Sequence, residues 1–186
     1  AAGVEVIVVD HHKCAAALPE ARALVNPNRL DECAEGAAHG HLAAVGVAFL
    51  LGAALLRTLR QRGWFASRPE PRLIDLLDLV ALGTVADVAA LRGLNRAFVM
   101  QGLKVMAARA NVGMSALIDA ARLTQAPSCT DLGFALGPRI NAGGRVGKSD
   151  LGVRLLTTAD PEEARAIAAE LDRLNEERRA IEAAVT

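Results

Sequence analysis

Two histidines and an aspartate stand together where an apolar run ends. The run Val6–Val9 is rich in β-branched residues and stops at Asp10-His11-His12. Such a run is typical of a strand buried on both faces of a parallel sheet, here expected over residues 4–9, and ligands bind beyond the carboxyl ends of such strands. Neighbouring imidazoles there can bind a divalent metal or a phosphate oxygen, with Asp10 fixing the tautomer of a histidine. A solvated loop is the alternative that this motif alone leaves open.

A further carboxylate interrupts an apolar segment much later in the chain. Asp87 lies in "LGTVADVAAL", residues 82–91. A carboxylate in such surroundings must be paired, hydrogen-bonded or bound to a metal, because leaving it desolvated costs on the order of several kcal/mol. A ligand role would therefore explain Asp87. Asp75 and Asp78 instead fall on the polar face of an amphipathic helix and are expected to be solvated.

The segment "GPRINAGGRVGK", residues 137–148, has the composition of an anion-binding loop. Its glycines allow backbone N–H groups to converge on an anion, while charge and hydrogen-bonding groups come from Arg139, Asn141, Arg145 and Lys148. A Gly- and Pro-rich connector between helices would look similar, but without the arginines. The sequence has neither a Walker phosphate-binding loop nor a Gly-x-Ser-x-Gly nucleophile elbow.

Composition places these residues in an α/β protein. Hydrophobic residues make up 52% of the 186 residues and aromatic residues only 3%, which favours helices packed on a buried sheet. The 21 basic and 21 acidic residues balance, so no overall field indicates a polyanionic partner. Cys14, Cys33 and Cys129 suggest neither a disulfide framework nor a zinc knuckle, which fits a reducing cytoplasm. Cys33 with His39 and His41 matches no common zinc pattern, and we expect an irregular loop there.

Periodicity predicts the elements that position these groups. After the first strand we expect loop over residues 13–40, with a short strand at 23–25. We expect "GTVADV" at 83–88 to interrupt a helix and Thr130 to cap a short segment. We expect the last helix to start with Asp160, Pro161 and Glu163, with Glu163 completing a capping box. No apolar run approaches membrane-spanning length. Helices are expected at 41–61, 73–82, 93–109 and 113–122 and from 160 onward.

Six segments together carry a family resemblance. They are "VIVVDHH", "VNPN", "LAAVGVAFLL", "LLDLVALGTVADV", "DLGFALGPRINAGGR" and "LNEERRAIE". In this order and spacing they resemble the RecJ single-stranded-DNA-specific exonucleases of the DHH phosphoesterase superfamily, over nearly the whole chain. The resemblance implies a helix-rich α/β fold with a small parallel sheet flanked by helices. Residues 1–158 would be the C-terminal portion of a DHH catalytic domain, and residues 159–186 would begin a long interdomain helix.

The resemblance also assigns roles to individual residues. His11 would be a metal ligand, His12 would contact the scissile phosphate or support the metals, and Asp10 would orient them. Asp87 would be a further ligand, so His11 and Asp87 are expected to meet at one divalent ion beyond the sheet. Less directly, the resemblance implies DNA-phosphate contacts by Arg139, Asn141 and Arg145.

The activity that the resemblance implies is 5′ to 3′ hydrolysis of single-stranded DNA by a two-metal centre of Mn²⁺ or Mg²⁺, in DNA repair and recombination. Single-stranded DNA would be the substrate, single-strand-binding protein and repair helicases would be partners, and the protein would be cytoplasmic without a membrane partner. RecJ proteins also carry a His-x-x-x-x-Asp-x-Asp motif and a lone aspartate before the DHH motif, and an OB fold after the catalytic domain. This sequence has none of these, so we expect an internal portion of such a protein, with little or no activity alone.

Two other functions remain open at the level of sequence. The chain could belong to a DHH-family phosphatase of oligonucleotides or cyclic dinucleotides. It could also be a non-catalytic DHH-fold scaffold that recruits partners. A scaffold should gain no thermal stability from Mn²⁺, whereas a phosphatase should prefer dinucleotides to long single strands.

Overall fold

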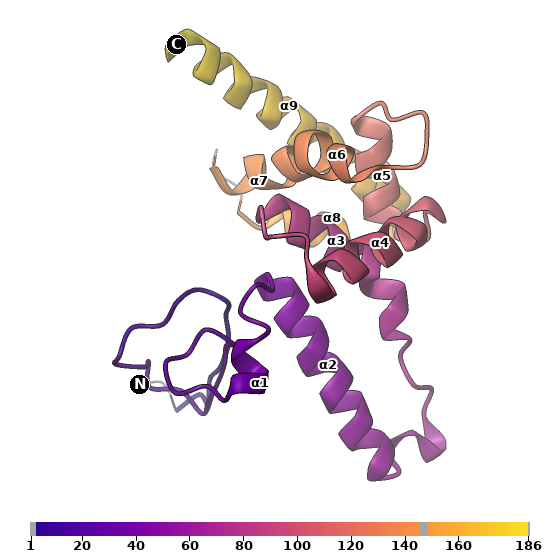
Figure 1. Ribbon diagram of the computed structural model, residues 1–186. Helices are drawn as coiled ribbons and strands as arrows, with labels where there is room; N and C mark the ends of the chain where they lie inside the picture. The colour runs from indigo at the N-terminus through magenta and orange to yellow at the C-terminus, as the bar shows by residue number, and fades with distance from the viewer. Residues whose placement is uncertain (1–2, 146–148, 186) are drawn as a thin grey trace.

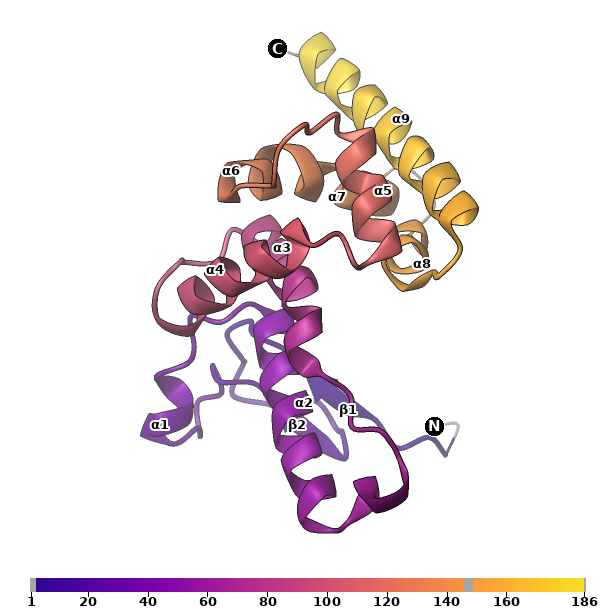
Figure 2. The same cartoon turned by 90° about the vertical axis from the view of Figure 1, so that its right-hand side faces the viewer.

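The computed structural model describes residues 3–145 and 149–185. Figure 1 shows two helices in the amino-terminal part of the chain and a group formed by the later helices, and Figure 2 shows the two strands. The strands β1 (Ile7–Val9) and β2 (Ala23–Val25) pair in parallel, with Ile7 opposite Ala23 and Val9 opposite Val25. The predicted fold class, helix-rich with a small parallel sheet, is confirmed.

Helices account for most of the remaining described chain. After β2 come α1 (Ala34–Ala37) and α2 (Ala44–Gln61), and α2 lies beside the sheet (Figure 2). The later elements are the 3₁₀ turns η1 (Trp64–Ser67) and η2 (Leu73–Leu76), α3 (Leu77–Ala86), α4 (Gly93–Ala107), α5 (Val112–Ala120), α6 (Cys129–Asp131), the π-helix η3 (Leu132–Leu136), α7 (Gly137–Arg145), α8 (Leu151–Thr157) and α9 (Pro161–Val185). The helices predicted at 41–61, 93–109, 113–122 and from 160 onward are confirmed, with small shifts at their ends.

Two hydrophobic clusters hold these elements together. A small cluster joins the sheet and α2 to α3 and α4 around Leu42, Val47, Leu77, Val80 and Phe98. A larger cluster joins α3 to α9, with members such as Met114, Leu117, Leu136 and Leu171 that are completely buried. Since α3 contributes to both clusters, it connects the sheet to the later helices.

The first strand differs from its prediction. Residues 4–9 were expected to form a strand buried on both faces, but β1 is only Ile7–Val9, and Val6 and Ile7 are 49% and 60% exposed. The physical reason is that, among the described residues, the sheet has only two strands, and α2 packs against β1 over a small area. A β-branched run therefore predicted the strand correctly but predicted its burial wrongly.

The helix α3 continues where an interruption was predicted. Its last turn contains Gly83 and Thr84, and it ends only at Ala86. A side chain at Gly83 would place its Cβ 2.9 Å from a methyl group of Val45 on α2, so this glycine permits close packing of α2 on α3. Asp87 is the C-cap residue of the helix and is followed by Val88, which has a left-handed φ of 58°.

The segment 137–148 is not an anion-binding loop where it is described. Residues Gly137–Arg145 form α7, directly after the π-helix η3. Backbone N–H groups inside a helix bond to carbonyls one turn earlier, so they are not free to surround an anion. The expected nest is therefore wrong for Gly137, Gly143 and Gly144, and Gly147 and Lys148 lie outside the described residues.

Two helix starts were predicted, one correctly. The carboxylate of Asp160 accepts a bond from the Glu162 N–H at 2.9 Å, as expected of a cap, but Glu163 bonds to Thr158 and Arg154 instead of completing a capping box. At α6 the cap is Ser128 rather than Thr130, with Asp131 completing a capping box.

The first part of α9 packs in the large cluster through Ala164, Ile167, Ala168, Leu171 and Leu174. The proposed division at residue 158 stays a prediction.

One described helix contradicts the expectation about membrane-length segments. The 18 residues of α2 have a mean hydropathy of 1.3, so by length and composition alone α2 could cross a membrane. One such helix is a weak indication, because core helices of soluble proteins have the same composition. In this structure α2 contacts β1 and α3 and carries Arg57 and Arg60 near its end.

Asp78 is buried, contrary to its predicted exposure, whereas Asp75 is exposed as expected. Asp78 is 3% exposed and its carboxylate accepts a bond from the Leu79 N–H at 2.8 Å. Burial raises the pKa of Asp78, and that hydrogen bond only partly opposes the shift. The proton therefore binds more tightly in the folded chain than in the unfolded chain.

Replacing Asp78 with asparagine is expected to stabilise the chain at neutral pH. Because the folded pKa is raised, stability is highest below the unfolded pKa and falls as pH rises toward the folded pKa. Asp78→Asn should therefore gain about 1–2 kcal/mol at pH 7, the usual cost of an under-bonded buried polar group, and about nothing near pH 3. Thermal unfolding at both pH values measures this. Asp75→Asn, at an exposed site, is the control, and a D78N gain that is equal at both pH values would contradict the explanation.

Candidate metal site at the Asp-His-His turn

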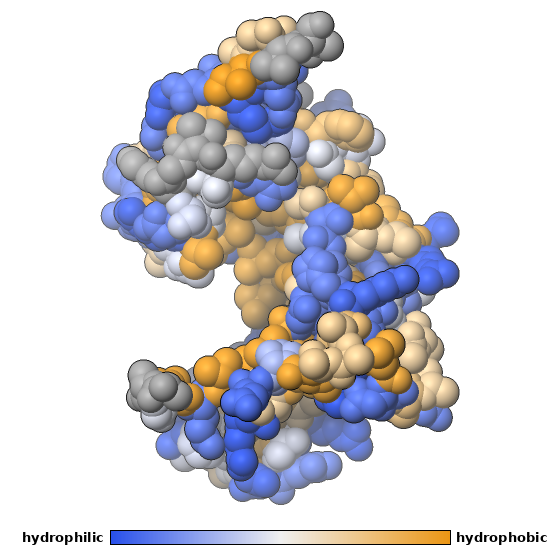
Figure 3. All heavy atoms as spheres, turned by 90° about the vertical axis from the view of Figure 1, so that its left-hand side faces the viewer, coloured by the Kyte–Doolittle hydropathy of each residue, from blue (hydrophilic) through white to orange (hydrophobic). Residues whose placement is uncertain are grey.

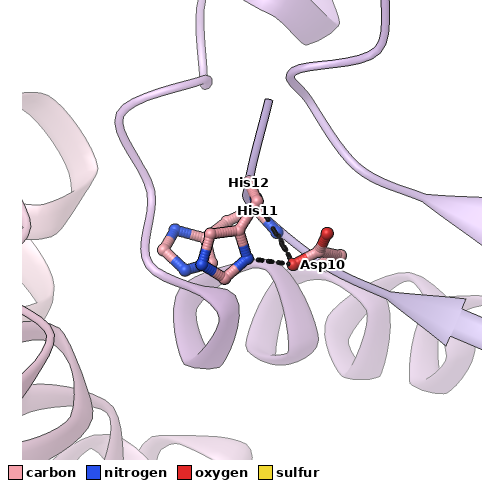
Figure 4. A group of neighbouring side chains, drawn as sticks. All are labelled: Asp10, His11 and His12. Carbon is pink, nitrogen blue, oxygen red and sulfur yellow. Dashed lines mark hydrogen bonds and ion pairs between the residues drawn. The ribbon is translucent and has the colours of Figure 1, made fainter. Parts of the chain in front are cut away.

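The chain leaves β1 into a turn that carries three chemically active side chains. The Asp10 N–H donates to the Val25 carbonyl at 3.1 Å, so pairing with β2 continues one residue beyond Val9. Asp10, His11 and His12 then follow at the carboxyl end of the sheet, and Figure 4 shows them gathered beside the ribbon of a helix. One ligand atom from each lies within 4.8 Å of the others, and the two imidazole rings are 4.4 Å apart.

The carboxylate of Asp10 organises this turn. Its Oδ1 accepts bonds from the N–H groups of His11 at 2.8 Å and His12 at 3.3 Å, and it lies 2.7 Å from Nδ1 of His12. The bond from His12 lowers the pKa of Asp10, with further lowering from the two backbone N–H groups, and Asp10 in turn raises the pKa of His12. Because Nδ1 of His12 is engaged, its Nε2 is the ring nitrogen available to a metal or a phosphate oxygen.

His11 and Asp87 meet although 76 residues separate them in the sequence. Nε2 of His11 lies 3.6 Å from Oδ2 of Asp87, and their side chains are 18% and 41% exposed. The prediction that these two residues meet is confirmed. The reason given for Asp87 was wrong, because the end of α3 leaves this carboxylate exposed rather than desolvated.

The spacing of these two atoms suits two ligands of one ion. A distance of 3.6 Å is too long for a good hydrogen bond. Two ligand atoms that each lie about 2.1 Å from one divalent ion would be separated by about 3.0–3.4 Å for octahedral or tetrahedral angles. A shift of a few tenths of an ångström would therefore let His11 and Asp87 bind the same ion. Nitrogen and carboxylate donors together suit Mn²⁺.

A cavity of about 600 Å³ adjoins Asp87. Figure 3 shows the molecule hollowed on this face, with apolar side chains gathered in the hollow. Asn141 on α7 and Asp87 are the polar side chains on the cavity wall, and the apolar ones include Val45, Leu79, Leu82, Ile140 and Leu156. Asn141 thus lines the same cavity as Asp87, and its predicted contact with phosphate stays a prediction.

The structure gives the partners of Arg139 but does not describe the side chain of Arg145. The Arg139 side chain is 11% exposed, forms an ion pair with Asp172 at 2.8 Å, and donates to the Ala135 carbonyl at 2.8 Å. These bonds join α7 to α9 and give the guanidinium a structural role, and its predicted contact with DNA stays a prediction. The side chain of Arg145 lies outside the described residues, so its predicted role stays a prediction.

Residues near the site were missed by the sequence analysis. Asn26 and Asn28 lie in the "VNPN" turn after β2 and donate hydrogen bonds to the backbone carbonyls of His12 and His11. The sequence contained a signal for these two residues, because their turn follows the strand that pairs with β1. The Cys33 thiol, considered for a second metal site, accepts a bond from the Gly36 N–H and caps α1.

Comparison with known proteins shows which proteins the chain resembles. No protein-family model matches the chain. The single-stranded-DNA-specific exonuclease RecJ of Dickeya dadantii strain 3937 is 49% identical over 97% of this chain. Over 97% of its length, the chain is therefore similar to a RecJ single-stranded-DNA-specific exonuclease. It spans 32% of the length of that RecJ protein.

Solved RecJ structures share the fold. A crystal structure of exonuclease RecJ bound to manganese matches 98% of this chain, and 43% of its own, with 39% identity and a TM-score of 0.80. RecJ of Thermus thermophilus in complex with Mg²⁺ matches 98% of this chain, and 26% of its own, with 37% identity and a TM-score of 0.75. The relationship therefore covers both the sheet and the helices.

Proposed function

We propose that this chain forms part of the catalytic domain of a metal-dependent exonuclease that removes nucleotides from single-stranded DNA in the 5′ to 3′ direction. The observation that carries the proposal is the 3.6 Å separation of His11 Nε2 and Asp87 Oδ2 beside the Asp10-His11-His12 turn. The RecJ relatives supply the substrate class, since the name of the Dickeya protein specifies single-stranded DNA. DNA repair and recombination are the corresponding processes.

We assign the metal to Mn²⁺ or Mg²⁺, which RecJ structures hold. His11 and Asp87 would hold the ion, and His12 would offer a further nitrogen. A bound divalent ion of this kind lowers the pKa of water and neutralises charge on a phosphate. Asp10 orients His12 through Nδ1, so that Nε2 can approach the ion or a phosphate oxygen.

The residues of the chain also position the substrate. The cavity beside Asp87 has mostly apolar walls, which exclude water and accept the flat face of a nucleotide. Asn141 supplies a neutral hydrogen-bonding group at its edge and is our proposed phosphate contact. The described donors Asp10, His11, His12 and Asp87 suffice for one ion, whereas a two-metal mechanism needs ligands for two.

Adding Mn²⁺ is expected to stabilise the chain against heat. Binding to the folded state alone stabilises by about 2.7 kcal/mol when the free ion is at about 100 times its dissociation constant. For a chain of this size that raises Tm by about 5–10 °C. Thermal unfolding with and without Mn²⁺, and with Ca²⁺ as a comparison ion, measures the shift. An unchanged Tm would favour a non-catalytic scaffold.

The chain by itself is expected to bind metal but to hydrolyse little DNA. The test is incubation of the purified chain with Mn²⁺ and 5′-labelled single-stranded DNA, beside a dinucleotide. Robust exonucleolysis of the long strand would refute the expected inactivity and support the assigned activity. Hydrolysis of the dinucleotide alone would point to a small-substrate phosphatase.

We propose a cytoplasmic location because the DNA substrate is there and because Cys14, Cys33 and Cys129 are free thiols. Single-strand-binding protein and repair helicases stay predicted partners.

A further inference from the structure

The turn after β2 carries two asparagines that no function above has used. Asn26 and Asn28 flank Pro27, whose ring fixes φ and stiffens the turn. Asn26 is 2% exposed. Its Oδ1 accepts a bond from the Asn28 N–H at 2.8 Å, which closes a local turn of the kind asparagine favours. This bond fixes the orientation of the Asn26 amide, including its NH₂ group.

Each of these amides donates to a carbonyl of the Asp-His-His turn. Nδ2 of Asn26 lies 2.8 Å from the His12 carbonyl oxygen, and Nδ2 of Asn28 lies 2.7 Å from the His11 carbonyl oxygen. Asn28 also donates to the Gly40 carbonyl at 2.9 Å, which ties the histidine turn to the segment before α2. Asparagine suits the task because its side chain accepts and donates at the same time.

These bonds complete a framework around the two histidines. The N–H groups of His11 and His12 are held by the Asp10 carboxylate, and their carbonyls are held by the two asparagines. A backbone fixed on both sides sets the directions in which the two side chains leave the turn, so that the His12 ring can reach Asp10 and the His11 ring can reach Asp87. A site that is already oriented loses less conformational entropy when it binds a ligand.

We propose that Asn26 and Asn28 are positioning residues that hold His11 and His12 in a metal-binding orientation before the ion arrives. The consequence for the metal rests on the proposed function, whereas the orientation of the rings does not. Groups that orient metal ligands typically change metal affinity by about 10- to 100-fold when removed. We expect a loss in this range for Asn28.

The test replaces Asn28 with leucine, which has a similar shape and no donor. Its matched control is Asn95→Leu, because buried Asn95 likewise donates to two carbonyls, those of His41 at 2.7 Å and Ala90 at 3.1 Å. A second variant, Gly40→Ala, leaves Asn28 in place but sets a Cβ 2.5 Å from its Oδ1, so the amide must move. Circular dichroism verifies that each variant is folded, and G40A carries the test if N28L does not fold.

Two readouts separate this proposal from the proposed function. The first, without metal, is the ¹⁵N-coupled NMR spectrum of the imidazole rings, which reports whether His12 keeps one fixed, hydrogen-bonded Nδ1. The second is Mn²⁺ affinity, measured from the electron paramagnetic resonance of the free ion. N28L and G40A are expected to disturb the signals of His11 and His12 and to weaken Mn²⁺ binding by about 10- to 100-fold, while N95L changes neither.

Each outcome decides the proposal. Unchanged ring signals in folded N28L and G40A would overturn it, as would Mn²⁺ affinity within about twofold of the original chain or an equal loss in N95L. If the original chain binds no Mn²⁺, the proposed function fails. The ring signals alone then show whether the asparagines position the histidines.

Discussion

Replacing His11 or Asp87 with alanine is expected to reduce the affinity of the chain for Mn²⁺ by more than about 100-fold. Removing a group that merely orients a ligand costs about 10- to 100-fold, and these two residues would be ligands themselves. Their atoms lie 3.6 Å apart, so each variant should remove one of two donors to the same ion. Isothermal titration calorimetry with Mn²⁺ measures the loss.

The control for Asp87→Ala is Asp75→Ala. Asp75 is exposed and pairs with Arg72 at 3.4 Å, so its removal tests the loss of one surface carboxylate. The double variant H11A/D87A should bind little more weakly than either single variant, because ligands of one ion act together. Independent effects that add in full would mean that the two residues do not share an ion, and the assignment of the site would then be wrong.

Replacing Arg139 with alanine is expected to lower the free energy of unfolding by about 3–5 kcal/mol, which corresponds to a fall in Tm of roughly 6–20 °C. Arg139 and Asp172 are 11% and 14% exposed, so the variant leaves a largely buried carboxylate whose other recorded pairing is with Arg122 at 3.6 Å. It also removes the bond to the Ala135 carbonyl beside the π-helix η3. Urea denaturation measures the change.

The matched control is Arg173→Ala on α9. Arg173 forms ion pairs with Glu170 at 2.8 Å and with Glu177, but its side chain is 53% exposed, so its loss should cost less than about 1 kcal/mol. The double variant Arg139→Met with Asp172→Leu should recover much of the stability, because an apolar pair can replace a buried ion pair. Equal effects of R139A and R173A would contradict the structural role of Arg139.

The sequence predicted the candidate site better than the surroundings of the site. An apolar β-branched run followed by Asp10-His11-His12 was sufficient to place three donors at the end of a strand, because backbone geometry there is local. Asp87 was correctly expected to meet His11, although the expectation came from a family resemblance and the stated reason of burial was wrong. Local patterns gave no information on how far α3 extends toward the sheet.

The local sequence pattern could not predict which charged side chains are buried or which partners they have. Asp78 was predicted to lie on the polar face of a helix. In the structure α3 packs in two hydrophobic clusters, on more than one of its faces, and Asp78 is buried. The DNA contact of Arg139 was implied by the family resemblance, and the structure adds that α7 brings this side chain against Asp172 of α9, 33 residues later. In both cases the packing of helices distant in the sequence decides the outcome, because it determines which charges lose contact with water.

By itself the sequence determined the donor chemistry, namely two imidazoles and a carboxylate at a strand end, and the helical periodicity of most of the chain. Only the tertiary structure decided that His11 faces Asp87, that Asn26 and Asn28 hold the histidine carbonyls, and that Arg139 is engaged with α9. The physical reason is the distance along the chain over which each effect acts. Backbone propensity acts over a few residues, whereas a metal site and its supporting hydrogen bonds form between segments that are joined only when the hydrophobic clusters pack.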